Sequence, residues 1–275
     1  MAYNTIMVQL DVDTAATPRL TFAMNLARRF EADLIGFAAA QAHMFVPPDD
    51  SGIVTAEMMR QRTDDIREKL KALKEEFLSV AGDGEHVSWR GELGDPTQFL
   101  AIHARAADLL VTGTPAPDVA GDGGRTVDPG TLILSAGRPV LFASDDLAPV
   151  LARRVVIAWK DTREARRAVA DAMPFLTDAQ EVSVITIAEG DQKTPRESAG
   201  DVVRFLMRHG VKAGSDVLGV GGANHEVAIA EIARETGADL IVAGGYGHSR
   251  LREWVFGGMT RSLLADGSLN RLFSN

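Results

Sequence analysis

Short continuous runs of apolar residues alternate with amphipathic stretches along the whole chain. Residues 5–10 and 154–159 each predict a buried strand, because a strand of a parallel sheet is covered on both faces and shows no alternation. A polar segment and then a helix-like stretch follow each run. The apolar positions of these stretches recur at spacings of three and four, which places them on one helical face. They are Leu20, Ala23, Leu26 and Ala27 in the first stretch, and Ala165, Ala168, Val169 and Ala172 in the second.

The whole pattern occurs twice. Residues 107–113 (ADLLVTG) match residues 238–244 (ADLIVAG), and each half ends with a short strand after Gly137 or Gly267. Each half runs strand, helix, strand, helix, strand, helix, strand, loop, helix, strand. Strands that alternate with helices predict a parallel sheet covered on both faces. The sequence therefore predicts an α/β fold of two tandem Rossmann-like open parallel five-stranded sheets with helices on both faces, in domains 1–148 and 149–275.

One segment breaks the symmetry between the halves. After a Pro-Pro-Asp-Asp-Ser-Gly loop at residues 47–52, the pattern predicts a long charged helix over residues 55–80. We interpret it as a surface helix with one buried stripe rather than as a helix that binds a partner. The apolar positions of the stripe are Ile66, Leu70, Leu73 and Phe77.

Composition narrows the classes of function. The 275 residues suffice for two domains, and the net charge of -9 argues against broad binding to nucleic acid or to anionic membranes. The absence of cysteine excludes disulfides, thiolate nucleophiles and zinc–thiolate sites. The N-terminal residues do not resemble a signal peptide, and no apolar run approaches the roughly 18 residues of a membrane span. We expect a soluble, cytoplasmic protein.

A glycine-rich loop is the strongest candidate for binding chemistry. Residues 244–250 (GGYGHSR) follow the predicted fourth strand of the second half, and residues 257–261 (GGMTR) open its last helix. Glycines beyond the carboxyl ends of parallel strands let backbone amides approach a phosphate, and the dipole of a helix start favours an anion. Thr260 adds a hydroxyl, and Arg250, Arg252 and Arg261 add positive charge. The alternative is that the glycines only form tight turns, but two clusters at fixed spacing favour a phosphate site.

The sequence lacks the common catalytic motifs. It contains no Gly-x4-Gly-Lys-(Ser/Thr), no Gly-x-Ser-x-Gly and no His-Glu-x-x-His. His248 follows the glycine loop and is the histidine best placed to act on a nucleotide, although a hydrogen bond within the loop is the simpler interpretation. His225 and Glu226 suit a helix start better than a metal site. We therefore assign no catalytic residue and no metal ligand.

The glycine loop resembles that of the universal stress protein family, whose ATP-binding members carry Gly-x2-Gly-x9-Gly-(Ser/Thr). Gly244, Gly247 and Gly257 fit this spacing. Gly258 stands at the family's Ser/Thr position, and Thr260 fits a further hydroxyl position of the same loop. The resemblance covers nearly the whole chain, twice. It implies a tandem protein whose two copies pack as two separate chains do in simpler members.

The resemblance also implies an adenine end of the site. Ala158, Trp159 and Lys160 match the end of the first strand, and Lys160 occupies the place of an aspartate that often contacts the base. Ile187 matches an apolar residue that packs against adenine, with an ordinary place in the strand core as the alternative. The expected nucleotide-binding residues are Ala158, Trp159, Lys160, Ile187, Ala243, Gly244, Gly247, Gly257, Gly258, Met259 and Thr260.

The first half departs from the family pattern. Gly113 is followed by residues 114–118 (TPAPD), so the second glycine is missing. At the start of the last helix, Pro129 offers no amide hydrogen and Asp128 would repel a phosphate. Asp11 stands where the base-contacting aspartate belongs. We expect this half to be structural or to bind something other than ATP.

The resemblance implies a stress-response regulatory protein that binds ATP, alone or with Mg, in its second half and hydrolyses it slowly or not at all. Its partner would be an adenine nucleotide, without nucleic acid or membrane, and the chain would be an internal pseudo-dimer, alone or as a homodimer. Two alternatives remain open. One is a tandem scaffold or sensor that binds no nucleotide. The other is an enzyme of the wider adenine-nucleotide hydrolase group, which residues 159–162 (WKDT) disfavour, because the substrate-activating members have Ser-Gly-Gly-x-Asp-Ser there.

Overall fold

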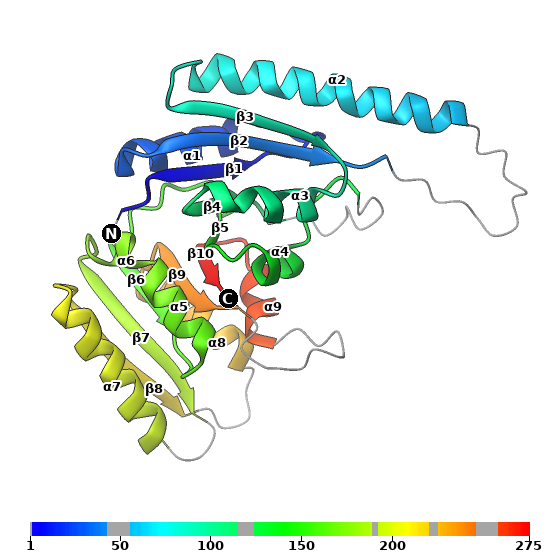
Figure 1. The fold of residues 1–275 in the computed structure, drawn as a ribbon. Coiled ribbons are helices and arrows are strands. Elements are labelled where there is room, and N and C mark those ends of the chain that lie inside the picture. Colours follow the sequence, from blue (N-terminus) through cyan, green and yellow to red (C-terminus); the bar gives the residue numbers. More distant parts are fainter. Residues whose placement is uncertain (1, 43–55, 115–123, 189–191, 220–224, 246–257) are drawn as a thin grey trace, which may run out of the picture. The chain divides into compact units, whose positions relative to one another are not determined.

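The computed structural model describes residues 2–42, 56–114, 124–188, 192–219, 225–245 and 258–275. These residues form two compact units. The first unit is Asn4–Ala136, and the second is Gly137–Asn275 together with Met1–Tyr3. Each unit carries parallel strands joined through helices, which confirms the predicted tandem α/β fold (Figure 1).

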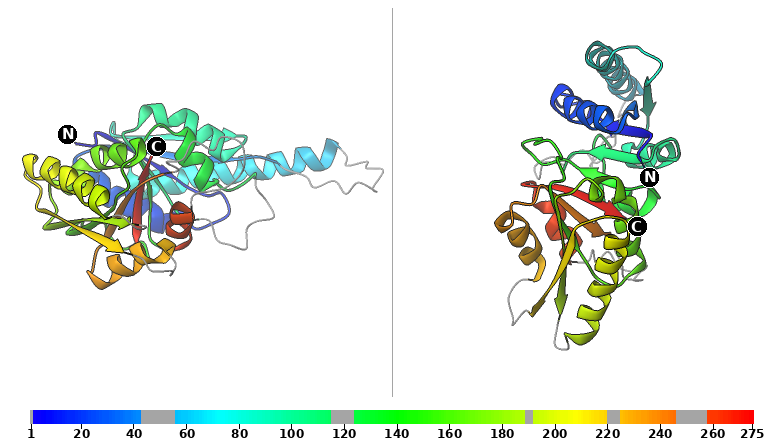
Figure 2. Two further views of the ribbon diagram at one scale, coloured as in Figure 1. Left: turned by 90° about the horizontal axis from the view of Figure 1, so that it is seen from below. Right: turned by 90° about the vertical axis from the view of Figure 1, so that its left-hand side faces the viewer.

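In the first unit the strand order is β3-β2-β1-β4, and all neighbouring strands are parallel. Helix α1 packs against α2, and α3 packs against α4, so the helices cover the sheet in two pairs (Figure 2). The elements of this unit are β1 (Thr5–Gln9), α1 (Thr17–Phe30), β2 (Asp33–Ala40), α2 (Ala56–Ala81), β3 (Val87–Leu93), α3 (Pro96–His103), the 3-10 turn η1 (Ala104–Ala106), β4 (Leu109–Thr112) and α4 (Pro129–Ser135).

The second unit repeats this order with β8-β7-β6-β9-β10, again parallel throughout. Helix α7 packs on β7 and β8, and α8 packs against α9. The elements are β5 (Val140–Phe142), β6 (Arg154–Ala158), α5 (Arg163–Asp171), α6 (Met173–Leu176), β7 (Glu181–Ala188), α7 (Lys193–Arg208), β8 (Ala213–Gly219), α8 (His225–Glu235), β9 (Leu240–Gly244), α9 (Gly258–Ala265) and β10 (Asn270–Ser274).

Strand β5 departs from the expected arrangement. It is the last strand of the first sequence repeat, yet it belongs to the second unit and pairs there with β10 in antiparallel register, Leu141 opposite Leu272. Within the described residues the first unit therefore has four strands, and the second has five parallel strands plus β5. The compact units divide at Gly137, which is a division in space. The predicted boundary at residue 148 divides the two sequence repeats and remains a prediction.

The apolar faces predicted from the sequence are the ones that the fold buries. All eight positions predicted on the faces of α1 and of the stretch that begins at α5 are buried, and so are the four stripe positions of α2. Local signals also fix the helix starts. The Asp95 carboxylate accepts a hydrogen bond from the amide of Gln98 ahead of α3, and the Thr162 hydroxyl accepts one from the amide of Ala165 ahead of α5.

Candidate functional site

The mouth of the second unit is the edge where the parallel strands β6 and β9 end. Ala158 of β6 lies opposite Ala243 of β9 in the register, and the chain leaves these neighbouring strands toward opposite sides of the sheet. In an open parallel sheet this is the switch point, where crossover connections diverge and leave a crevice for ligands. The predicted glycine loop begins here, since Gly244 is the last residue of β9. The structure thus brings Ala158, Ala243 and Gly244 together.

Trp159 and Lys160 follow β6 directly and differ in their surroundings. Trp159 is only 6% exposed, and its indole Nε1 donates a hydrogen bond to Ser198 Oγ of α7 at 2.9 Å. Its backbone is fixed as well, because its amide donates to Ile185 O and its carbonyl accepts from Thr186 Oγ1. Lys160 is exposed. Trp159 therefore forms part of the wall beside the mouth, while Lys160 lies at its rim.

Ile187 lies near the carboxyl end of β7, the strand next to β6. It is partly exposed, whereas its strand neighbours Thr186 and Ala188 are buried. An apolar side chain that stays partly open at this edge is available to an apolar ligand surface. This partial exposure fits both predicted roles of Ile187, contact with a ligand and an ordinary place in the strand core.

Gly244 has a packing reason to be glycine. A Cβ atom at this position would lie 2.5 Å from the amide nitrogen of Ala165 and 2.7 Å from the carbonyl carbon of Glu164. Both atoms belong to the backbone of the first turn of α5, so the end of β9 packs directly against the helix. The amide of the next residue, Gly245, donates to Ser274 O of β10. Gly244 is thus required by the fold, independently of any phosphate.

Helix α9 begins at Gly258, and it connects the carboxyl end of β9 to the start of β10. Because β9 and β10 are parallel, this helix must begin at the edge where β9 ends. Gly258 and Met259 are partly exposed, whereas Thr260 is only 6% exposed. Arg261 is exposed. Other residues predicted for this loop lie outside the described residues: Gly247, His248, Arg250, Arg252 and Gly257.

The corresponding mouth of the first unit is filled by its own side chains. Arg19, from the first turn of α1, donates through Nη1 to Gln9 O, Gln9 Oε1 and Asp11 Oδ2 at 3.1, 3.0 and 2.8 Å. Gln9 Oε1 also accepts from Thr112 Oγ1 at 2.8 Å, and Gln9 Nε2 donates to Asp11 Oδ1. A Cβ on Gly113 would lie 2.4 Å from Arg19 Nη2. The guanidinium group therefore covers Gly113, the glycine that follows β4.

Sequence patterns indicate Asp11 and Asp128 at this edge, but they do not indicate Arg19. Arg19 gives no signal of its own, since a charged residue in the first turn of a helix is ordinary. The structure also explains Asp128, whose carboxylate accepts a hydrogen bond from the amide of Thr131 and caps α4. This acidic cap, followed by Pro129, occupies the position where a phosphate site needs free amides.

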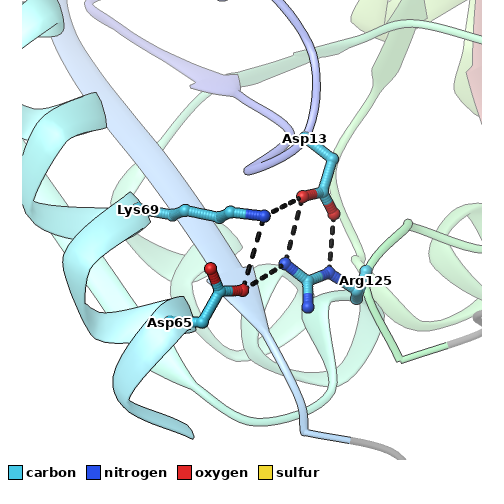
Figure 3. A network of polar contacts seen from close by, with 4 residues as sticks. All are labelled: Asp13, Asp65, Lys69 and Arg125. Carbon is cyan, nitrogen blue, oxygen red and sulfur yellow. Dashed lines mark hydrogen bonds and ion pairs between the residues drawn. The ribbon is translucent and has the colours of Figure 1, made fainter. Parts of the chain in front are cut away.

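A second network of charges in the first unit joins Asp13, of the loop after β1, to Asp65, Lys69 and Arg125 (Figure 3). Asp13 accepts from Arg125 Nε at 2.6 Å, from Arg125 Nη2 at 3.0 Å and from Lys69 Nζ at 2.7 Å. Asp65 lies 3.4 Å from both Arg125 Nη2 and Lys69 Nζ. Burial raises the pKa of Asp13, but the hydrogen bonds from Arg125 and Lys69 outweigh burial and lower the pKa below the ordinary value of 3.8.

Asp13 should therefore make the stability of the first unit sensitive to acid. Because its folded-state pKa is depressed, its contribution is present above about pH 4 and is lost as the pH falls through the lower, folded pKa. In urea titrations the wild type should be more stable than Asp13→Asn at neutral pH, and the difference should shrink at about pH 3. A difference of equal size at both pH values would contradict this assignment.

A pocket of about 620 Å³ lies in the first unit between α3 and α4, and Asp128, the cap of α4, is part of its lining. Its lining includes Thr97, Gln98 and Ile102 of α3 and Thr131 and Ser135 of α4, and it contains none of the predicted nucleotide-binding residues.

Within the described part of the chain, no group of three or more His, Cys, Asp or Glu residues is arranged to hold a metal ion. Among the described helices, none combines the length and the hydropathy that a transmembrane span requires.

Two compact units, each with parallel strands and a switch point between its first and fourth strands, define a tandem α/β protein of Rossmann-like architecture. No protein-family model matches the chain. No curated protein matches it either. Solved structures match it over 99% of its length, and universal stress proteins are among them.

A universal stress protein from Archaeoglobus fulgidus DSM 4304 superposes with a TM-score of 0.67 at 13% identity, covering 99% of this chain and 96% of that one. A protein of unknown function from Pseudomonas aeruginosa PAO1 gives a TM-score of 0.61 at 17% identity, covering 99% of this chain and 92% of that one. A candidate universal stress protein from Pseudomonas aeruginosa UCBPP-PA14 gives 0.62 at 17% identity, with 99% and 93% covered. The resemblance predicted from the glycine loop is thus confirmed at the level of the fold.

Proposed function

We propose that this protein is a stress-response regulatory protein that binds ATP, alone or with Mg, at the mouth of its second unit. The observation that supports this proposal is the difference between the two mouths. At the mouth of the first unit, Arg19 covers Gly113 and donates hydrogen bonds to Gln9 and Asp11. In the second, Ala158, Ile187 and the start of α9 are partly exposed around the end of β9, from which the glycine loop departs.

In this proposal each predicted residue has a separate task. Ala158 and Ile187 would receive the apolar face of the base, with the buried indole of Trp159 as a fixed wall. The amides at Gly247, Gly257 and Gly258 would receive the phosphates at the start of α9, where the helix dipole favours an anion. Thr260 and Arg261 would support them. No residue is proposed as catalytic, and hydrolysis would be slow or absent. A cytoplasmic location and the internal pseudo-dimer belong to the same proposal.

Restoring a hydroxyl at Gly258 should tighten ATP binding. Gly258→Ser adds one hydrogen-bond donor at the helix start, and a hydrogen bond to a charged phosphate is expected to raise the affinity roughly ten-fold. Calorimetry with ATP and magnesium measures this change. Gly214→Ser is the matched control, because Gly214 is exposed on β8 and a Cβ there meets no atom within 4 Å. If Gly258→Ser and the wild type bound ATP with equal affinity, the start of α9 would not be part of the site.

A scaffold or sensor that binds no nucleotide is the second candidate. It is favoured by the packing reason for Gly244, by the missing hydroxyl at Gly258 and by the burial of Thr260. A ligand bound by the native state alone must raise the melting temperature, so a thermal titration with ATP and magnesium separates the two candidates. A melting temperature that stays constant up to millimolar ATP would favour the scaffold.

A further inference from the structure

Six charged side chains form two networks at the carboxyl end of β1 in the first unit, an inner layer and an outer layer. The inner layer joins Arg19 of α1 to Asp11, Gln9 and Thr112 at the ends of β1 and β4. The outer layer joins Asp13 of the loop after β1 to Lys69 and Asp65 of α2 and to Arg125 ahead of α4 (Figure 3). Three cations face three carboxylates, so the two layers together are electrically neutral.

The inner groups and Arg125 are largely removed from solvent, whereas the side chains of Asp13, Lys69 and Asp65 in the outer layer are 44%, 39% and 49% exposed. Gln9 and Thr112 are each 2% exposed, and the side chains of Arg19, Asp11 and Arg125 are 17%, 16% and 15% exposed. Buried polar groups are costly to leave without partners, so any group that displaces Arg19 must replace its bonds to Gln9 and Asp11. A phosphate that paired with Arg19 would leave the carboxylates of Asp11 and Asp13 facing its negative charge.

The outer layer also fixes helix α2. The residues from Glu57 to Arg62 are exposed, and Ile66 is the first buried residue after them. Lys69 and Asp65 lie at this point, where the helix first meets the rest of the unit. A second attachment follows at Glu76, whose Oε1 accepts hydrogen bonds from Thr17 N and Thr17 Oγ1 at 3.0 and 2.6 Å.

We infer that these two layers act as a lock, which keeps the mouth of the first unit closed to nucleotides and holds α2 against the loop after β1. The lock is part of the fold and needs no ligand. One consequence rests on the proposed function: if the second unit binds ATP, the chain takes up one nucleotide rather than two. The lock itself is independent of that function.

Hydrogen exchange tests the lock directly. Asp13→Asn keeps the shape of the side chain and removes the charge that Arg125 and Lys69 share. Amide exchange in the loop at residues 10–16 and at residues 63–72 of α2 should accelerate, by roughly five-fold or more if the network contributes as much as a typical stabilising interaction. Asp64→Asn is the matched control, because Asp64 lies on the same helix, carries the same charge and pairs with the exposed Arg67. Unchanged exchange in Asp13→Asn, or equal acceleration in both variants, would overturn the lock.

Native mass spectrometry, which counts the bound nucleotides, tests the prediction that the chain takes up one nucleotide rather than two. With saturating ATP the wild type should carry one nucleotide, and Gly247→Val, which crowds the loop of the second unit, should carry none. Two nucleotides on the wild type would refute the closed mouth, and one nucleotide retained by Gly247→Val would contradict the proposed role of that glycine. If the wild type carries none, the proposed ATP function fails, and the exchange experiment still decides the lock.

Discussion

Arg271→Met should lower the free energy of unfolding of the second unit by roughly 3 kcal/mol or more, because several buried carbonyls lose their donor at once. Arg271 is 1% exposed. Its Nη1 donates to the carbonyls of Leu263, Leu264 and Asp266 at the end of α9, and its Nη2 donates to Ala143 O after β5. One side chain thus completes the end of a helix and fastens the antiparallel strand β5.

The charge of Arg271 persists at neutral pH. Burial lowers its pKa to about 10, against the opposing effect of the carboxylates of Asp145 and Asp266. Methionine keeps most of the side-chain volume, so the loss in Arg271→Met reports the hydrogen bonds and not a cavity. Urea unfolding followed by circular dichroism measures the change.

Arg234→Met provides the control for Arg271→Met. Arg234 also pairs with Asp266, at 2.7 Å, but its side chain is 46% exposed. An exposed ion pair contributes little, so this variant should stay within about 1 kcal/mol of the wild type. If both variants lost the same stability, the buried carbonyls would not be the reason.

Gly244→Ala should destabilise the second unit by about 2 kcal/mol or more. The added Cβ would lie 2.5 Å from Ala165 N and 2.9 Å from Ala165 Cα. Those atoms are helix backbone and cannot rotate away, so α5 must move off the end of β9. Overpacking of this kind costs about 1–3 kcal/mol. The melting temperature and the urea midpoint measure it.

Gly200→Ala is the same chemical change, but we expect it to have the opposite effect on stability. Gly200 lies inside helix α7, and its added Cβ would meet only Arg204 Nη1 at 3.5 Å. Alanine forms helices better than glycine, so this variant should be more stable, by up to about 1 kcal/mol. A neutral Gly244→Ala would show that the end of β9 can yield, and glycine at position 244 would then need a ligand to explain it.

The candidate site could be predicted from the sequence only in part. Spacing placed Gly244 at the end of a strand and Gly258 at the start of a helix, and the structure agrees for both. It could not tell that α5 backbone covers Gly244, because the contact joins residues about eighty positions apart. Nor could it find Arg19, whose function in the fold depends on Gln9, Thr112 and Gly113 being brought together.

The sequence by itself determined the elements, their buried faces and the twofold repeat, because these follow from periodicities of neighbouring residues. It also determined that the two halves differ at the glycine loop. Only the tertiary structure decided that β5 joins the second unit beside β10, and that Arg19 closes one mouth. Such pairings join distant residues, and the free energy of burying polar groups, which selects among them, is defined only once the chain has folded.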